Sequence, residues 1–147
     1  MAKYSTRGSM ALIAATSVQS VIGSATVRPR IYDIVLSSSS APNDYSASFG
    51  FQRFTADGTG TAVTPKPLDF ADPVSIATSK NTYTVEPTLT ANEILLQLAH
   101  NIRATVRWLC APGSELIIPA TAGNGIAMVC NVVSTQFTEV VTLMFEE

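Results

Sequence analysis

The sequence predicts an all-β fold of about eight strands, arranged as a sandwich or a barrel. Short apolar or alternating runs recur about every 8–12 residues, separated by segments rich in Gly, Pro, Asn and Ser. Hydrophobic residues make up 46% of the chain and charged residues only 14%, and the abundant Thr, Val and Ile favour pleated sheet. A chain of 147 residues is expected to form a single domain, 1–147, with its own core.

The N-terminal third is expected to begin with an arm and to continue as strands. Residues 1–8 form the expected N-terminal arm. Two short strands, or one bent strand, are predicted over 9–15 and 17–22. The run RPRIYDIVLS over 28–37 predicts a further strand, because it is rich in residues that favour strands. Pro29 stands at the start of the run, a position that is compatible with an edge strand.

Residues 46–55 show the clearest strand pattern. They follow an expected exposed turn over 37–44, which is rich in Ser, Pro, Asn and Asp. The alternation of SASFGFQRFT places Phe49 and Phe51 on one face. We therefore predict that both rings belong to the core.

The segment 56–80 is predicted to be a long loop. It contains repeated Gly and Pro in its first part and an Asp-Pro pair at Asp72–Pro73, so neither a long helix nor a long strand fits it. Loops of this length are uncommon in compact domains unless they bind a ligand or pack on a neighbour. We expect this segment to be a contact element.

The segment 91–101 fits either a helix or a strand. Thr90, just before the segment, and Glu93, its third residue, match a helix capping box. The apolar residues of the segment also share one helical face. A strand is favoured, because the segment would then form a hairpin with the run RATVRWLC that follows it. Residues 103–147 are read as strand after strand, with no helix.

The sequence contains no set of residues arranged for catalysis, so we predict no catalytic, cofactor-binding or metal-ligating residue and no enzyme. His100 is the single histidine and lies in an apolar run, which favours a structural or rim position. Asp57-Gly58-Thr59-Gly60 lacks the further acidic residues that a calcium loop or an aspartic protease needs, and is read as a tight turn. Trp108, beside Arg107, is either a core indole or part of a binding hot spot.

The two cysteines lie twenty residues apart in predicted strands. Two buried thiols are the favoured interpretation of Cys110 and Cys130. A disulfide is the alternative and would need Cα atoms within about 7 Å of each other. No second cysteine stands near either one, which argues against zinc.

Charge and hydropathy exclude two classes of partner. The net charge is -2, whereas binding to nucleic acid through its phosphates needs a basic stripe. No run approaches the roughly 20 apolar residues that span a bilayer. We predict neither nucleic-acid nor membrane binding, and the scarcity of charge favours assembly with other protein subunits.

Four phrases of the sequence resemble a family of small virion structural proteins of tailed bacteriophages. They are RIYDIVLSSSSAPND, FQRFTADGTGTAVTPKPLD, RATVRWLCAPGSELIIPATAGNGIAM and MFEE, and the similarity covers about residues 7–147. Members of this size and β-rich character are similar to capsid decoration, or cement, proteins of jelly-roll type. The resemblance implies a jelly-roll-like β-sandwich without catalytic residues or cofactors, made in the host cytoplasm and located on the capsid exterior.

The resemblance also implies the partners. The protein would form a homo-oligomer, with a trimer favoured, and would clamp adjoining subunits of the major capsid protein. Stable interfaces of this kind bury more than about 1,000 Å². The loop over 56–80 and the arm over 1–8 are the expected contact elements, and Arg7, Arg28 and Arg30 either pair with an acidic capsid surface or stay solvated.

The alternative function is a receptor- or glycan-binding module of a tail fibre or spike. Sugar sites favour an exposed aromatic ring beside carboxylates and amides, and Tyr45 near Asn43 and Asp44 is the one such group in the sequence. The same three residues also fit an ordinary turn.

Overall fold

The computed structural model describes residues 1–12, 15–40, 43–133 and 136–147, so the expected strand over 9–15 and turn over 37–44 fall partly outside the described residues. Every regular element of the described chain is a β-strand, which confirms the all-β prediction. The strands are β1 (Lys3–Ala11), β2 (Ser17–Ile22), β3 (Arg30–Ser38), β4 (Ser46–Ala56), β5 (Thr59–Val63), β6 (Lys66–Pro67), β7 (Thr78–Val85), β8 (Thr88–Asn101), β9 (Val106–Leu109), β10 (Leu116–Ile117), β11 (Gly125–Val133) and β12 (Thr138–Glu146).

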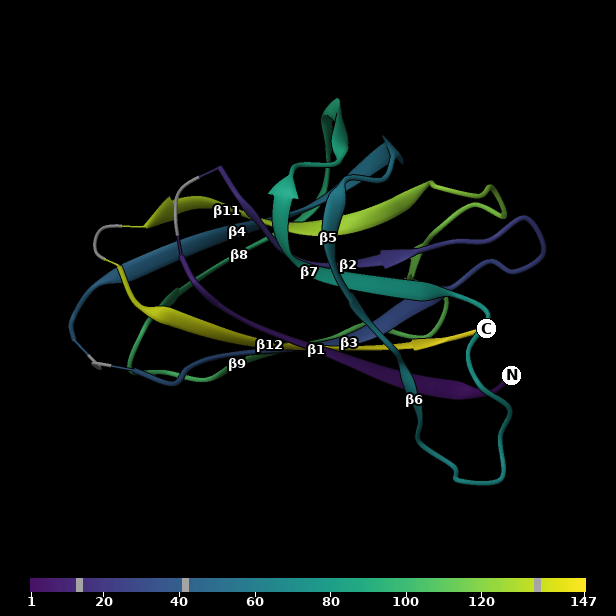
Figure 1. Cartoon of the computed structure of the whole chain (residues 1–147). Coiled ribbons are helices and arrows are strands. Elements are labelled where there is room, and N and C mark those ends of the chain that lie inside the picture. Colours follow the sequence, from purple (N-terminus) through teal and green to yellow (C-terminus); the bar gives the residue numbers. More distant parts are fainter. Residues whose placement is uncertain (13–14, 41–42, 134–135) are drawn as a thin grey trace.

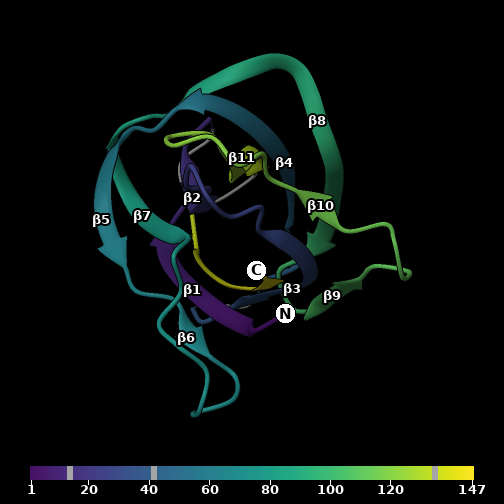
Figure 2. The same cartoon turned by 90° about the vertical axis from the view of Figure 1, so that its right-hand side faces the viewer.

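Two antiparallel sheets pack face to face as a β-sandwich (Figures 1 and 2). The first sheet has the order β10-β3-β12-β1-β6, with β9 also paired to β3. The second has the order β5-β7-β2-β11-β4-β8. Closing two sheets over one another buries one face of each, which suits a chain whose strands alternate apolar and polar residues.

Eight of the strands have the order of a jelly roll. They form one sheet β1-β12-β3-β9 and a second sheet β2-β11-β4-β8, so the first and last strands are neighbours and the chain crosses repeatedly between the layers. The short strands β5 and β6, together with β7, are an insertion between β4 and β8. The predicted jelly-roll-like sandwich of about eight strands is therefore found, with one insertion added.

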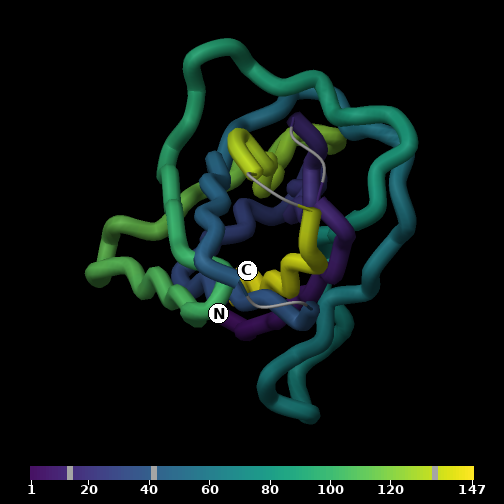
Figure 3. The backbone as a smooth tube through the Cα atoms, turned by 90° about the vertical axis from the view of Figure 1, so that its left-hand side faces the viewer, coloured from purple at the N-terminus to yellow at the C-terminus, as the bar shows by residue number. Residues whose placement is uncertain are grey.

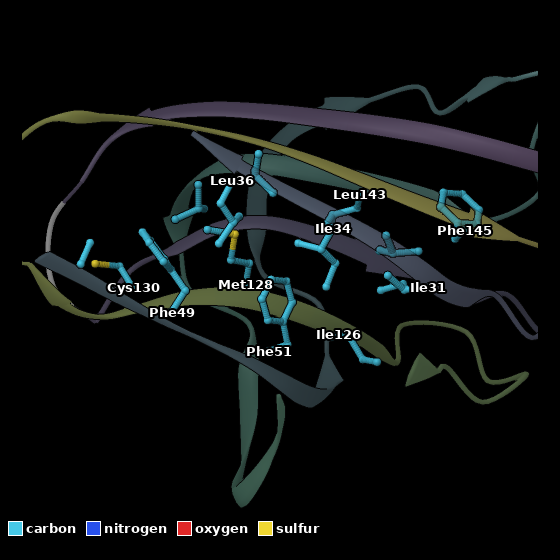
Figure 4. Packing of buried hydrophobic residues seen from close by; sticks show 14 of the residues in the cluster. Ile31, Ile34, Leu36, Phe49, Phe51, Ile126, Met128, Cys130, Leu143 and Phe145 are labelled. Atoms are coloured by element: carbon cyan, nitrogen blue, oxygen red, sulfur yellow. The ribbon is translucent and has the colours of Figure 1, made fainter. Parts of the chain in front are cut away.

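The core lies between the two sheets and consists of large apolar side chains from both layers (Figure 4). Phe49 and Phe51 of β4 are fully buried, as their alternation predicted. They face apolar side chains of the opposite layer, including Leu36 of β3 and Leu143 of β12. Burial of each large apolar side chain contributes roughly 1.5–3 kcal/mol to folding.

The ambiguous segment 91–101 lies within strand β8, as favoured. Asn92 has a φ of 62° in the left-handed region, where a helix cannot continue. The two residues of the capping-box pattern lie in strand β8 instead. The Glu93 carboxylate pairs with Arg53 at 3.2 Å, and the backbone carbonyl of Thr90 accepts a hydrogen bond from the Gln52 side chain.

Two expectations about connectivity are wrong. Strand β8 does not form a hairpin with β9, because β8 pairs with β4 in one sheet and β9 pairs with β3 in the other. The expected arm over 1–8 is not free either. Residues from Lys3 onward belong to β1, which is paired with β12 along its whole length and with β6 at Tyr4 and Ser5.

The predicted loop over 56–80 is shorter in the structure. Residues 59–63 pair with β7 at the edge of one sheet, and residues 66–67 pair with β1 at the edge of the other. The insertion thereby crosses from one layer to the other along the side of the sandwich (Figure 3). The longest irregular stretch that remains is 68–77, which projects away from the rest of the chain between β6 and β7 (Figures 1 and 2).

Candidate functional site: an apolar loop and a basic groove

Residues 68–77, here called the apolar loop, expose large hydrophobic side chains. Phe70 has a relative exposure of 101%, so its ring touches almost nothing in its own chain. Leu68, Val74 and Ile76 are more than half exposed on the same loop. A cluster of this kind on a projecting segment marks an interaction surface more often than a chance exposure.

Hydrogen bonds fix the base of the apolar loop to the two ends of the described chain. The Leu68 amide donates to the Lys3 carbonyl at 2.7 Å, and the Tyr4 hydroxyl donates to the Pro73 carbonyl at 3.1 Å. The Glu147 carboxylate accepts from the amides of Ile76 and Ala77 at 2.7 and 2.9 Å. These contacts and the buried Ala77 hold the base of the loop in one shape, although its larger apolar side chains are mostly exposed.

The tip of the apolar loop is shaped by local turn chemistry. The Asp69 carboxylate accepts a hydrogen bond from the Ala71 amide at 2.9 Å, and the Asp69 carbonyl accepts one from the Asp72 amide at 3.1 Å. Aspartate often caps turns in this way because its short side chain reaches the backbone two residues on. The turn leaves Phe70 pointing outward between two acidic residues.

A groove runs along the outer surface beside the insertion. Its first part has a volume of about 530 Å³ and lies between β1 and the β5–β6 connection, and its second part has about 520 Å³. The two parts share Arg7 and Thr142, so they form one continuous surface, here called the basic groove. Its lining residues are Ser5, Thr6, Arg7, Gly8, Ser9, Val63, Thr64, Lys66, Asn81, Val140 and Thr142.

The lining of the basic groove carries positive charge. Arg7 and Lys66 are exposed, and neither forms a salt bridge within the described chain. The remaining lining residues are uncharged, mostly Ser and Thr. Such a surface can take an acidic or hydrogen-bonding partner with a modest apolar component.

A histidine and a glutamate are buried together near one end of the sandwich. His100 Nε2 of β8 lies 3.3 Å from Glu139 Oε1 of β12, and the exposures of the two side chains are 1% and 0%. The His100 ring also stacks on Phe49, with ring centroids 5.9 Å apart, and its Nδ1 lies 3.0 Å from the Asn101 carbonyl. The pair thus bridges the two sheets.

The surroundings of this pair shift both of its pKa values upward. Hydrogen bonding to Glu139 is the main cause that raises the pKa of His100, and burial acts against it. Burial is the main cause that raises the pKa of Glu139, and His100 acts against it. Because no solvent reaches either side chain, the pair can link the layers and respond to pH but cannot touch a substrate in this conformation.

The other sequence candidates lie apart from the loop and the groove. Arg28 and Arg30 do not lie beside Arg7. Arg30 is in register with Glu146 of β12, whereas Arg7 is in register with Thr142, further along the same strand. Tyr45 is 43% exposed, and the neighbouring Asp44 carboxylate lies 3.4 Å from Arg103. The structure therefore does not bring the predicted arginines together into one patch.

Trp108 occupies a core-facing position on β9. Its indole is half-buried and packs against the main core, whereas the neighbouring Arg107 is exposed. The Arg107 guanidinium forms a forked hydrogen bond to the buried Asp33 carboxylate of β3, with Nη2–Oδ2 at 2.6 Å and Nε–Oδ1 at 3.0 Å. The two side chains thus stabilise the pairing of β9 with β3.

The cysteines are both free thiols. Cys130 is buried and Cys110 is half-buried. Burial raises the pKa of Cys130 to about 11, so its thiol stays protonated and inert at neutral pH. The favoured prediction, two unpaired cysteines, is confirmed, although only one of them is fully buried.

The Asp57-Gly58 turn forms a small polar site at the end of β4. The Lys80 ammonium contacts the Asp57 carboxylate and donates to the Gly58 carbonyl at 2.9 Å. Across the described ranges, no three His, Cys, Asp or Glu side chains gather in a way that could hold a metal ion. The same described residues also contain no helix that is long and apolar enough to cross a membrane.

Comparisons with family models, curated proteins and solved structures found no match to this chain.

The sequence predicted a long loop over a segment that includes residues 68–77, but it did not predict the exposed apolar side chains there or the buried pair of His100 and Glu139. Glu139 is separated from His100 by 39 positions, so no local motif joins them. A signal did exist, because Glu139 falls on the same alternating face as Val141, Leu143 and Phe145, all of which are buried. A carboxylate on the core face of a strand predicts a buried partner.

Proposed function

We propose that this protein is a structural component of a bacteriophage virion: a capsid decoration, or cement, protein that binds the assembled shell of major capsid protein as a homo-oligomer, with a trimer favoured. The observation that carries the proposal is the apolar loop. It is an ordered, projecting segment with a fully exposed Phe70 on a chain that is otherwise poor in surface charge.

The physical requirements of a cement protein support this proposal. Such a protein stabilises a shell by burying surface across subunit boundaries, and it needs a rigid body with contact elements rather than a catalytic cleft. The sandwich supplies the rigid body, and the insertion between β4 and β8 supplies a fixed apolar contact element. The sequence phrases that resemble small phage virion proteins favour the shell as the partner.

A sedimentation assay tests the proposal. The purified protein is mixed with assembled capsids and, separately, with unassembled capsid subunits. We expect it to sediment with the shells in hundreds of copies per particle and to ignore the free subunits. Equal binding to both forms would contradict a cement function, and a handful of copies per particle would favour a tail location instead.

Two matched substitutions show whether shell binding depends on the apolar loop. Phe70→Ser removes the exposed ring at the loop tip, whereas Val132→Ser removes an apolar side chain that is 59% exposed on β11. We expect the first change to weaken shell binding at least about tenfold, as for an aromatic anchor, and the second to leave it unchanged.

A further inference from the structure

The apolar loop has the properties of a preformed ligand. Large apolar side chains are exposed on it, yet backbone hydrogen bonds to Lys3 and to Glu147 keep it ordered. An ordered segment loses little conformational entropy when it binds, so more of its contact energy is available for affinity. The loop therefore fits insertion into a surface that already exists.

The charges of the apolar loop and of the basic groove are opposite. The loop carries Asp69 and Asp72, with no cation between residues 67 and 77. The groove carries Arg7 and Lys66, with no acidic residue in its lining. Within the described part of the chain, no salt bridge involves any of these four side chains.

The sizes of the two surfaces also correspond. The two parts of the groove, of about 530 and 520 Å³, fall in the range of about 300–1,000 Å³ that is typical of binding sites. A groove of this size accepts an aromatic side chain with its flanking residues. The Ser and Thr residues of its lining can hydrogen-bond to the backbone of an inserted turn.

The loop cannot fill the groove of its own chain. Its first residue is held by the Lys3 carbonyl, and its last two residues are held by Glu147, so the tip points away from the sandwich (Figure 2). Loop and groove are therefore two different surfaces of one chain. A contact between different surfaces of identical subunits is head-to-tail, and it closes into a ring when the rotation allows.

We propose that the apolar loop of one copy inserts into the basic groove of the next copy, with Phe70 as the anchor and with Asp69 and Asp72 paired to Arg7 and Lys66. Repetition of this contact closes a ring of identical subunits. This inference rests on the proposed function, which includes a homo-oligomer, and it names the contact between the subunits of that oligomer.

Charge reversal followed by rescue tests this contact, with the mass measured by light scattering after size exclusion. The wild type is expected to be a multiple of 15.6 kDa. Arg7→Glu with Lys66→Glu, or Asp69→Lys with Asp72→Lys, should each weaken assembly at least about 100-fold, because like charges then face each other. The four changes together restore opposite charges in every contact and should restore the wild-type mass.

Two further measurements apply if a reversed variant fails to fold. Phe70→Ser should give a monomer with an unchanged far-ultraviolet spectrum, whereas Leu109→Ser, a matched change at a 61% exposed position on β9, should keep the wild-type mass. For the wild type, raising the salt concentration from 0.05 to 0.5 M should weaken assembly, because the paired charges are at the surface.

The outcomes separate this inference from the proposed function. A monomeric wild type, or a Phe70→Ser variant of wild-type mass, overturns the head-to-tail contact. Loop variants that keep the wild-type mass but lose binding to shells show that the loop docks on the capsid instead. A wild type that assembles through the loop and ignores shells keeps the contact but removes the cement function.

Discussion

The interior of the sandwich and the apolar loop both carry large apolar side chains, but in opposite environments. Phe51 in the interior has 0% exposure, whereas Phe70 on the loop has 101%. The first ring packs among side chains of both sheets, and the second has hydrogen-bonded backbone beneath it but no apolar neighbours. Burial of the first ring stabilises the fold of the single chain, whereas the second ring adds no packing to it, which is why we propose the loop as a contact element.

The largest expected effect tests the interior. Phe51→Ala should lower the free energy of unfolding by about 3–5 kcal/mol, because a cavity opens where the ring was packed. Denaturant unfolding followed by fluorescence or circular dichroism measures the change. A loss below about 1 kcal/mol would mean that the interior at Phe51 is not closely packed.

The next effect concerns the buried pair that links the two sheets. His100→Gln should cost about 3 kcal/mol at pH 6, because the buried Glu139 then loses the imidazolium that pairs with it. The cost should be smaller at pH 9, since the wild-type imidazole loses its proton, and with it its stabilising contribution, as the pH rises through the folded pKa of His100. Urea unfolding of the variant at both pH values measures this difference.

The wild type should also depend on pH through the same pair. The folded pKa of His100 lies above its ordinary value of 6.5, so its stabilising contribution is complete below pH 6.5 and is lost as the pH rises through the folded pKa. The raised pKa of Glu139 acts in the same direction at pH values above 4.5. The double variant His100→Gln with Glu139→Gln lacks both titratable groups, so its free energy of unfolding should depend less on pH. If the free energy of unfolding of this variant changed with pH as much as that of the wild type, the pair would not have this role.

A smaller effect is expected at the base of the apolar loop. Glu147→Ala removes both hydrogen bonds to the amides of Ile76 and Ala77, and should cost about 1 kcal/mol because the site is partly solvated. Hydrogen exchange should show lost protection at those two amides. Glu146→Ala, at the neighbouring half-buried position, is the control and should leave them protected.

The smallest effect on stability is expected at the tip of the loop. Phe70→Ala should change the free energy of unfolding of the monomer by less than about 0.5 kcal/mol, because the ring has no packing to lose. The measurement is denaturant unfolding at a concentration low enough to dissociate any oligomer. A loss as large as that of Phe51→Ala would remove the distinction between the two regions.

The sequence predicted strands well where one face is buried. Alternation over 46–55 identified Phe49 and Phe51 as core, because successive side chains of a strand point to opposite faces. The prediction was wrong for 1–8, which were expected to form an arm. In the structure these residues form most of β1, whose Tyr4 and Thr6 face inward.

The connections between strands could not be predicted from local pattern. The hairpin expected between β8 and β9 looked natural because the two strands are close in sequence, yet a jelly roll places them in different sheets. Which strands pair is decided by the closure of the whole core, because each strand has several partners of comparable pattern.

Local sequence pattern was sufficient to predict the all-β class, the apolar faces of the strands and a long loop within 56–80. These features follow from periodicity and from turn residues, which act over a few positions. The folded chain was needed to show that part of this segment projects as an anchored apolar loop, that a basic groove lies beside β1, and that Glu139 lies next to His100 between the layers. Those features depend on residues that are far apart in the sequence and meet only when the chain folds, and no local pattern shows which of them will meet.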